Sequence, residues 1–323
     1  MKKIFLFLIV IAILSSAILI GGKAADKPEA VRIGISKLMA HPALDSIEKG
    51  IIDYLAENGI DAEIETQNAN GDISTAVSIA QLFDTEKKDL VVGIATPTAQ
   101  ALANTFEDIP VVFATVTDPE SAGLSGLDNV AGTSDMVPVE EHLNIIEDVT
   151  GAKRIGMIYT SGEANGITLM EAMKAACDKR GVELITASVS NSSEVKMAAE
   201  SIIDRVDAVY EATDNTVISA IAAVSEVCIE NNVPLFSADV TSSFDADVLI
   251  AGGFDYYASG LLTGEVVKRM LSGEKAEDIG MLYLEDLEIL VNLDVAEILG
   301  IQIPDDIMER ARYVIKDDRT KTI

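Results

Sequence analysis

The sequence is poor in the residues from which metal sites and nucleic-acid-binding surfaces are usually built. It has no tryptophan, two cysteines and two histidines among 323 residues, and 5% of its residues are aromatic. So few cysteines and histidines argue against a zinc site, and we expect neither a metal nor a cofactor. Lys and Arg number 24 against 53 Asp and Glu, for a formal net charge of −29. A surface this acidic repels phosphate backbones, so no nucleic acid is expected as a partner.

Signatures of catalysis are absent as well. The chain contains no G-x-S-x-G, G-x-x-x-x-G-K-[ST], H-E-x-x-H or G-x-G-x-x-G motif. Its cysteines, Cys177 and Cys228, lie inside helical patterns, where a free cysteine usually behaves as a small buried hydrophobe. A two-lobed racemase would need its catalytic cysteines in loops at strand ends, so this placement argues against that kind of enzyme. We expect a protein that is not an enzyme.

The first 24 residues have the pattern of an export signal. Two lysines precede an uncharged apolar run at 4–20, and the small residues Gly22 and Ala24 follow it. This pattern is typical of a cleaved secretory signal peptide, but the run is close to the length of a membrane span, so an uncleaved signal-anchor is the alternative. No cysteine follows the run as a lipidation site. In either case the rest of the chain is expected outside the cytoplasm: secreted, periplasmic or anchored to the outer face of the cytoplasmic membrane.

From Val31 onward, short runs rich in β-branched residues alternate with amphipathic stretches. With 49% hydrophobic residues, the chain is long enough for two domains with cores of their own. Apolar strands that alternate with helices predict an α/β fold with a parallel sheet covered on both faces. The first half predicts strands at 31–36, 62–67, 90–94 and 111–114, and helices at 43–58, 73–86 and 97–104.

The same order of elements recurs in the second half. Arg32 in the first predicted strand matches Arg154 at an offset of 122, and Asp89 before the third strand matches Asp207 at an offset of 118. A third match, at an offset of 124, surrounds Pro110 before the fourth strand. Three ordered matches at nearly equal offsets predict two doubly wound α/β lobes of similar design.

Polar residues follow the predicted strands in both lobes. In α/β folds, ligands bind where the carboxyl ends of parallel strands meet the starts of helices, and two facing lobes form a cleft there. The residues that we expect to contact a ligand are Ser36, Thr96, Thr98, Thr117, Asp118, Asn165, Asp214, Asn215, Asp239 and Asp255.

These residues suit a zwitterion such as an amino acid. Thr96 and Thr98, at a helix start, can hold a carboxylate, while Asp214 or Asp118 can pair with an ammonium group. Asn165 can bond to either group. Other interpretations stay open, because Thr96 and Asp214 are also favoured helix N-caps and Asp118 begins a common turn.

Other residues near the predicted strand ends have more than one interpretation. Tyr159 and Phe113 could form an apolar wall for the ligand, or could equally belong to the core. His41 and His142 lie at predicted helix starts without a matching cluster of ligands, so they are interpreted as surface or capping residues. Glu163 or Ser161 is interpreted as the cap of the helix that follows them.

Short motifs spread along the chain carry a resemblance to a known family. They are 41–45 (HPALD), 68–72 (NANGD), 95–101 (ATPTAQA), 116–124 (VTDPESAGL), 161–165 (SGEAN), 213–216 (TDNT) and 255–257 (DYY). Together they resemble the ABC transporter substrate-binding protein family that includes tryptophan- and tyrosine-type binding proteins, from about residue 31 to residue 311. Two positions depart from the family pattern, with Lys37 in place of glutamine and Gly166 in place of serine.

The resemblance implies a type I periplasmic-binding-protein fold, with two lobes joined by three crossovers and a ligand cleft between them. Lobe 1 would comprise 31–140 plus about 252–283, and lobe 2 would comprise 141–251 plus about 284–315. Residues 316–323 would remain as a polar tail.

The resemblance also implies a function. The chain would be an extracytoplasmic solute-binding protein of an ABC importer that delivers a small amino-acid-like ligand, with aromatic amino acids among the candidates, to a permease and its ATPase. Membrane contact would occur through the N-terminus or the permease. The alternatives are a membrane-anchored domain that senses a ligand and signals to a receptor, and a two-lobed racemase-like enzyme.

Overall fold

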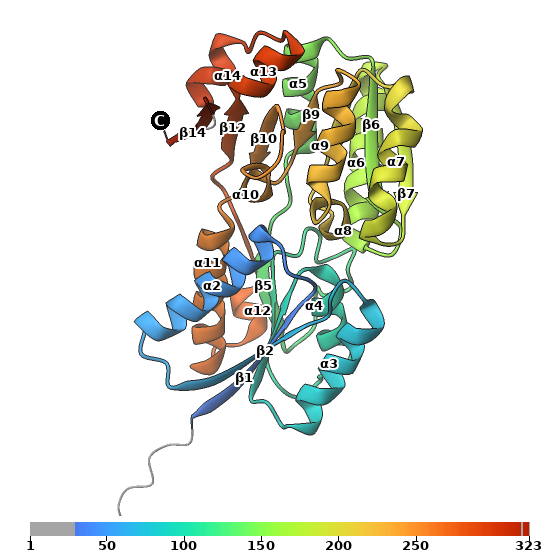
Figure 1. Cartoon of the computed structure of the whole chain (residues 1–323). Helices are drawn as coiled ribbons and strands as arrows, with labels where there is room; N and C mark the ends of the chain where they lie inside the picture. The colour runs from blue at the N-terminus through green and yellow to red at the C-terminus, as the bar shows by residue number, and fades with distance from the viewer. Residues whose placement is uncertain (1–29, 318, 323) are drawn as a thin grey trace, which may run out of the picture.

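A computed structural model describes residues 30–317 and 319–322 of the chain as two α/β lobes (Figure 1). The predicted export signal or anchor at 1–24 lies outside the described residues. Within the described ranges, no helix is both long and apolar enough to cross a membrane. Each lobe is a largely parallel sheet with helices on both faces, so the predicted fold class is confirmed.

The sheet of lobe 1 is entirely parallel and has the strand order β11-β5-β4-β3-β1-β2. Helices α2, α11 and α12 cover one face, and α3 and α4 cover the other. The strands are β1 (Val31–Lys37), β2 (Ala62–Asn68), β3 (Leu90–Ile94), β4 (Val111–Ala114), β5 (Val130–Ser134) and β11 (Met281–Tyr283), and the helices are α2 (Pro42–Glu57), α3 (Ile73–Thr85), α4 (Thr96–Ala103), α11 (Tyr256–Leu271) and α12 (Ala276–Ile279).

The sheet of lobe 2 has the order β14-β13-β12-β10-β9-β8-β6-β7. It is parallel except where β12 meets β10 and where β14 meets β13. The strands are β6 (Arg154–Thr160), β7 (Glu183–Val189), β8 (Ala208–Glu211), β9 (Leu235–Ser237), β10 (Ile250–Gly253), β12 (Glu288–Asn292), β13 (Tyr313–Lys316) and β14 (Arg319–Thr322).

Helices cover both faces of this second sheet too. One face carries α5 (Val139–Thr150), α6 (Ala164–Arg180), α13 (Leu293–Leu299) and α14 (Asp305–Arg310), and the other carries α7 (Val195–Ile202), α8 (Asn215–Ile218), α9 (Ile221–Glu230) and α10 (Val240–Ser243). The 3₁₀ turns Ser192–Glu194 and Ile203–Arg205 flank α7. Cys177 in α6 and Cys228 in α9 are buried and free, as expected.

The chain passes between the lobes three times, after β5, after β10 and after β11. It therefore returns to lobe 1 for α11, α12 and β11 before it completes lobe 2. The polar residues at 316–323 were expected to be only a tail. Instead, Arg319–Thr322 forms an exposed strand whose backbone pairs antiparallel with β13 at the edge of the sheet.

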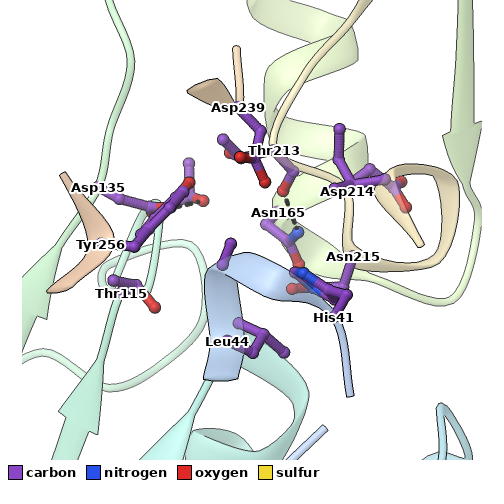
Figure 2. Close-up of a pocket in the computed structure, with 13 residues that line it drawn as sticks. His41, Leu44, Thr115, Asp135, Asn165, Thr213, Asp214, Asn215, Asp239 and Tyr256 are labelled. Carbon is purple, nitrogen blue, oxygen red and sulfur yellow. Dashed lines mark hydrogen bonds between the residues drawn. The ribbon is translucent and has the colours of Figure 1, made fainter. Parts of the chain in front are cut away.

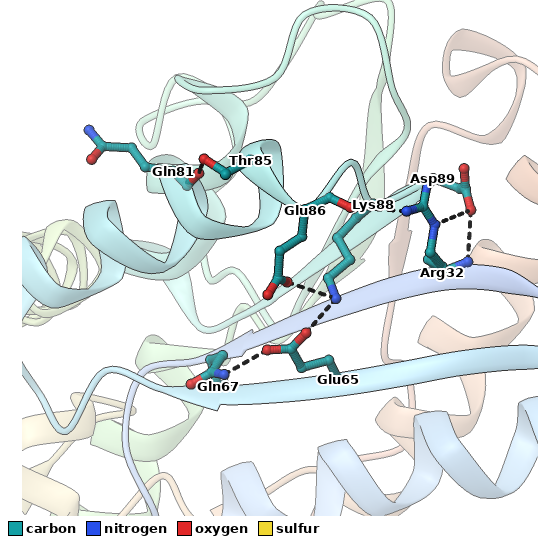
Figure 3. Close-up of polar contacts among 8 residues, drawn as sticks. All are labelled: Arg32, Glu65, Gln67, Gln81, Thr85, Glu86, Lys88 and Asp89. Atoms are coloured by element: carbon teal, nitrogen blue, oxygen red, sulfur yellow. Dashed lines mark hydrogen bonds and ion pairs between the residues drawn. The ribbon is translucent and has the colours of Figure 1, made fainter.

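The sequence repeat has a structural counterpart at the amino ends of the two sheets, and Figure 3 shows the lobe 1 pair of Arg32 and Asp89. In lobe 1 the backbone N–H of Arg32 donates to the Asp89 carboxylate over 2.8 Å, and the N–H of Asp89 donates back to the Arg32 carbonyl over 2.8 Å. In lobe 2, Arg154 and Asp207 make the same two bonds, at 2.9 and 2.8 Å. Beside the lobe 1 pair, the buried Lys88 amine lies between the carboxylates of Glu65 and Glu86 (Figure 3).

Two glycines allow the late segment α11 to pack closely on α2. A methyl group on Gly50 would lie 2.4 Å from the carbonyl oxygen of Tyr257, and one on Gly260 would lie 2.3 Å from that of Ile47. The two backbones therefore touch without intervening side chains. Around this contact, apolar residues of both helices bury themselves against the sheet of lobe 1.

Candidate ligand-binding site

A small cavity lies between the lobes, at the carboxyl ends of their strands (Figure 2). Its volume is about 20 Å³, which holds a water molecule rather than a larger compound. Lobe 1 contributes His41, Ala43, Leu44, Thr115, Thr117, Asp135 and Tyr256, and lobe 2 contributes Asn165, Thr213, Asp214, Asn215, Ile218 and Asp239.

Buried carboxyl groups from both sides face this cavity. Asp135, directly after β5, accepts hydrogen bonds from the hydroxyls of Thr117 (3.1 Å) and Tyr256 (3.2 Å). Asp239, before α10, accepts from the backbone N–H of Ser242 (2.9 Å) and from its hydroxyl (3.1 Å). Burial raises the pKa of Asp135 to about 7 and also raises the pKa of Asp239. Among the described residues, no Lys or Arg lines the cavity to balance these acids.

Asp214 also lines the cavity, but lobe 2 already satisfies its carboxylate. It accepts from the backbone N–H (2.6 Å) and hydroxyl (2.7 Å) of Thr160, and it caps α8 through the N–H of Val217 (3.1 Å). The N-cap interpretation of this residue is therefore correct. Burial, and then the charge of Glu163, raise the pKa of Asp214 to about 7. Gly166 makes room for this carboxylate, because a methyl group there would lie 2.3 Å from its Oδ2.

Glu163 caps a different helix from the one predicted. It occupies the N-cap position of α6, but its side chain makes no capping bond there. Its carboxylate instead accepts from the backbone N–H (3.0 Å) and hydroxyl (2.7 Å) of Thr216 and from the side chain of Asn215 (2.6 Å). It thus satisfies the first turn of α8, a long-range contact that local sequence cannot reveal.

Asn165 and Thr213 present polar atoms that lack partners. The Asn165 amide donates to the Thr213 carbonyl over 2.9 Å (Figure 2). Its Oδ1 and the Thr213 hydroxyl are buried and make no hydrogen bond within the described structure. Because burying an unpaired polar atom is costly, a polar ligand in the cavity would satisfy both.

Both histidines differ from the sequence interpretation. His41 was expected on the surface or as a cap, but it is 7% exposed and lines the cavity. It occupies the N-cap position of α2 without capping it, and neither ring nitrogen has a hydrogen-bond partner in the described structure. His142 is buried in lobe 2, where Nδ1 lies 2.8 Å from the Tyr210 hydroxyl, and burial lowers its pKa to about 4. Both side chains face the interior because neighbouring elements cover the starts of their helices.

Several other predicted site residues lie away from the cavity. Thr96 and Thr98 are buried in α4, and the Thr98 hydroxyl donates to the carbonyls of Ile94 (2.6 Å) and Ala95 (3.0 Å). The Thr98 hydroxyl is thus already used as a donor to its own backbone, and neither threonine lines the cavity. Ser36 is buried in β1 and does not line the cavity either.

The remaining two acids have local structural roles. Asp118 accepts from the backbone N–H groups of Glu120 and Ser121, both at 3.1 Å, as the turn interpretation requires. Asp255 caps α11 through the N–H of Tyr257 (2.9 Å) and that of Ala258 (3.1 Å). Neither residue lines the cavity.

The aromatic lining differs from the one considered in the sequence. Phe113 is 1% exposed and belongs to the core of lobe 1, and Tyr159 does not line the cavity. Tyr256, whose hydroxyl bonds to Asp135, lines it instead. The DYY motif at 255–257 was the available signal for this residue.

Comparisons with known proteins agree with this architecture. The chain matches the family model described as ABC transporter substrate binding protein over residues 32–315. It is 34% identical over 310 residues to a tyrosine-binding protein of Clostridioides difficile (strain R20291), a match that covers 93% of this chain and 89% of that protein.

Two solved structures are similar along nearly the whole described chain. A domain from Streptococcus pneumoniae in complex with L-Trp is 32% identical, with a TM-score of 0.84 and coverage of 89% of this chain and 100% of that one. The ligand-free, open structure of a substrate-binding protein with adhesive properties from Clostridium difficile is 34% identical, with coverage of 89% and 99% and a TM-score of 0.66. At nearly equal identity, the structure is thus more similar to the L-Trp complex than to the open form.

Proposed function

Because the chain belongs to the ABC transporter substrate-binding protein family, whose members bind substrates and are not enzymes, we propose that it is the extracytoplasmic solute-binding protein of an ABC importer. It captures an amino acid between its lobes and passes it to a permease and the associated ATPase. The export pattern of residues 1–24 supports a location outside the cytoplasm.

The observation that carries the choice of ligand is the pair of buried acids, Asp135 and Asp239, in a cavity that no Lys or Arg lines among the described residues. A buried carboxylate is stable only when a cation or several hydrogen-bond donors face it. The ammonium group of an amino acid provides both a charge and three N–H donors. The relatives that bind tyrosine and L-Trp support an amino acid, and an aromatic one among the candidates.

Asp239 replaces Asp214 as the acid that we expect to bind the ammonium group. The Asp214 carboxylate already accepts three hydrogen bonds from lobe 2. Asp239 accepts two, both from Ser242, and so has capacity for a ligand. Asp135 faces the same cavity from the other lobe. A ligand held by both acids would therefore bind the two lobes to each other.

Closure of the lobes fits the size of the cavity. A space of about 20 Å³ does not admit an amino acid, so the lobes have to separate for entry and to close again around the ligand. The higher TM-score to the L-Trp complex than to the open structure supports assignment of this arrangement to the closed state. The segments that cross between the lobes after β5, β10 and β11 would act as the hinge.

Calorimetric titration with each of the twenty amino acids, L-tyrosine and L-tryptophan first, tests the proposal. We expect Asp239→Asn to weaken the binding of the preferred amino acid by about 10- to 100-fold, because a charge-assisted hydrogen bond becomes a neutral one. The matched control is Asp118→Asn, an acid in a turn away from the cavity, which should bind like the wild type. A wild-type protein that binds no amino acid would contradict the proposed ligand.

The transport step needs a test in cells. Deletion of the gene should reduce uptake of the labelled amino acid that the purified protein binds, and the wild-type gene should restore it. The Asp239→Asn gene should restore less. Unchanged uptake in the deletion strain, together with tight binding in vitro, would contradict import and leave a binding protein with another partner.

A further inference from the structure

We propose that the start of α2, together with His41, is the subsite for the carboxylate group of the ligand. This inference rests on the proposed function, since it assigns the second half of an amino acid to the same cavity. The sequence placed this carboxylate at Thr96 and Thr98, but the Thr98 hydroxyl bonds to its own backbone.

The helix starts around the cavity differ in one respect. Helices α6, α8, α10 and α11 each have an acidic residue at the N-cap, and α2 has His41 there. The acidic residues are Glu163, Asp214, Asp239 and Asp255. Within the described residues, α2 is thus the one among these helices without an acid at the N-cap; the acid of its first turn, Asp45, pairs with Lys37 over 2.6 Å. The positive end of the α2 dipole is available to a carboxylate from outside.

The first turn of α2 also has unused hydrogen-bond donors. Pro42 at the first helical position has no N–H, and the first backbone bond of the turn runs from Asp45 to the His41 carbonyl over 3.0 Å. The N–H groups of Ala43 and Leu44 have no partner within the described structure, and both residues line the cavity. A helix of 16 residues thus begins at the cavity with two amides that have no partner in the described structure.

His41 is the second, independent observation at this place. Its ring is 7% exposed and lines the cavity, with the Asn215 side chain as its polar neighbour, and neither ring nitrogen makes a hydrogen bond of full geometry in the described structure. Burial lowers the pKa of His41, opposed by the charge of Asp239, and so favours the neutral ring, which has one donor and one acceptor nitrogen. One ring N–H can donate to a ligand carboxylate alongside the two amides, and Figure 2 shows the ring beside Asn215 at the edge of the cavity.

The two halves of the cavity are therefore complementary to a zwitterion. The α2 start offers N–H donors and positive dipole charge, while Asp239 and Asp135 offer carboxyl groups that an ammonium group can ionise and pair with. Such an arrangement should reject amines that lack a carboxylate, because the amides and the His41 ring would remain unpaired.

The experiment uses His41→Asp in the full exported protein. An aspartate at the N-cap should stabilise α2, so the variant should fold, but its carboxylate would occupy the subsite and repel that of the ligand. Calorimetry compares L-tyrosine with tyramine and L-tryptophan with tryptamine. We expect the wild type to prefer the amino acid over the amine by about 100-fold, and His41→Asp to lose most of that preference.

A second variant and a control make the result specific. His41→Asn supplies a neutral cap that also engages the amides, and should reduce the preference by about tenfold. Ser46→Asp places the same charge in α2 away from the cavity and should retain the wild-type preference. Equal affinity for amine and amino acid in the wild type, or an unchanged preference in His41→Asp, overturns the subsite alone. A wild type that binds none of these compounds overturns the proposed function and this subsite with it.

Discussion

Tyr256 donates its hydroxyl to the carboxyl group of Asp135 over 3.2 Å, and each residue lies at a crossing between the lobes. Asp135 follows β5 at the first crossing, and Tyr256 begins α11 just after the second. The bond therefore joins two connecting segments at the edge of the ligand cavity. Any change in the Asp135 charge will therefore act on these connecting segments and on the cavity together.

Asp135→Asn should make stability less dependent on pH. Burial raises the pKa of Asp135 to about 7, so the native protein retains a proton that the unfolded chain releases above about pH 4. The free energy of unfolding should fall as pH rises from about 4 to about 7, and then level off. The variant, which has no such proton, should show a shallower fall in urea titrations of the ligand-free protein.

In Asp135→Asn, other buried acids will still cause part of the pH dependence of stability. Burial also raises the pKa of Asp214, to about 7, and that of Glu211. The quantity to compare is therefore the slope of the free energy of unfolding against pH. The control Asp118→Asn should have the same slope as the wild type. Identical slopes in Asp135→Asn and the wild type would show that Asp135 is ionised in the native state throughout this range.

Gly166→Ser should destabilise lobe 2. The new Cβ would lie 2.3 Å from Oδ2 of Asp214, and that carboxylate cannot move without losing its bonds to Thr160. We expect a loss of about 1–3 kcal/mol, as for other overpacked interiors, measured by denaturant unfolding. Gly162→Ala is the control, because its methyl group would meet only Ile73, at 3.7 Å. Equal stability of the two variants would contradict the contact.

Asp207→Ala should cost more than Arg154→Ala. One Asp207 oxygen accepts from the backbone N–H groups of both Lys153 (3.0 Å) and Arg154 (2.9 Å). Its removal leaves two backbone donors without partners, for a loss of about 1–2 kcal/mol. Removal of the Arg154 side chain breaks only an exposed ion pair and should change stability little. Thermal unfolding of both variants would show the reverse order if the ion pair were the important contact.

Gly50→Ala should loosen the packing of α2 on α11. The methyl group would lie 2.4 Å from the Tyr257 carbonyl oxygen, so the helices must separate. A loss of about 1–3 kcal/mol is expected from unfolding titrations, although alanine is the better helix former. Ser46→Ala, elsewhere on α2, should leave stability nearly unchanged, and wild-type stability in Gly50→Ala would contradict the close approach of the helices.

The repeated architecture could be predicted from the sequence because it depends on local patterns. The matched Arg32 and Arg154, and Asp89 and Asp207, occupy equivalent places at the amino ends of the two sheets. Strand and helix periods are properties of neighbouring residues, so the four strands predicted in the first half lie within a residue or two of their predicted positions, whereas β5 was missed. The return of the chain through α11 depends on contacts such as Gly50 with Gly260, which no local pattern records.

The site was only partly predictable, because residue type does not determine the direction of a side chain. Thr98 lies at the predicted helix start, yet its hydroxyl turns back to its own backbone. His41 lacked neighbouring ligands in sequence, and its buried environment comes from lobe 2 elements far along the chain. Asn165, Asn215 and Asp239 line the cavity as expected, since strand ends converge in any such fold.

Lobe 1 needs α11 to complete its core, so its elements cannot all fold in the order in which they are synthesised. A chain made from its N-terminus presents Ile47 and Ile51 of α2 long before residues 256–271 exist to cover them. The whole of 139–253 must be synthesised in between. Lobe 1 is thus begun first but cannot be completed until β6 to β10 of lobe 2 have been made, and α2 lacks its partner helix α11 until then.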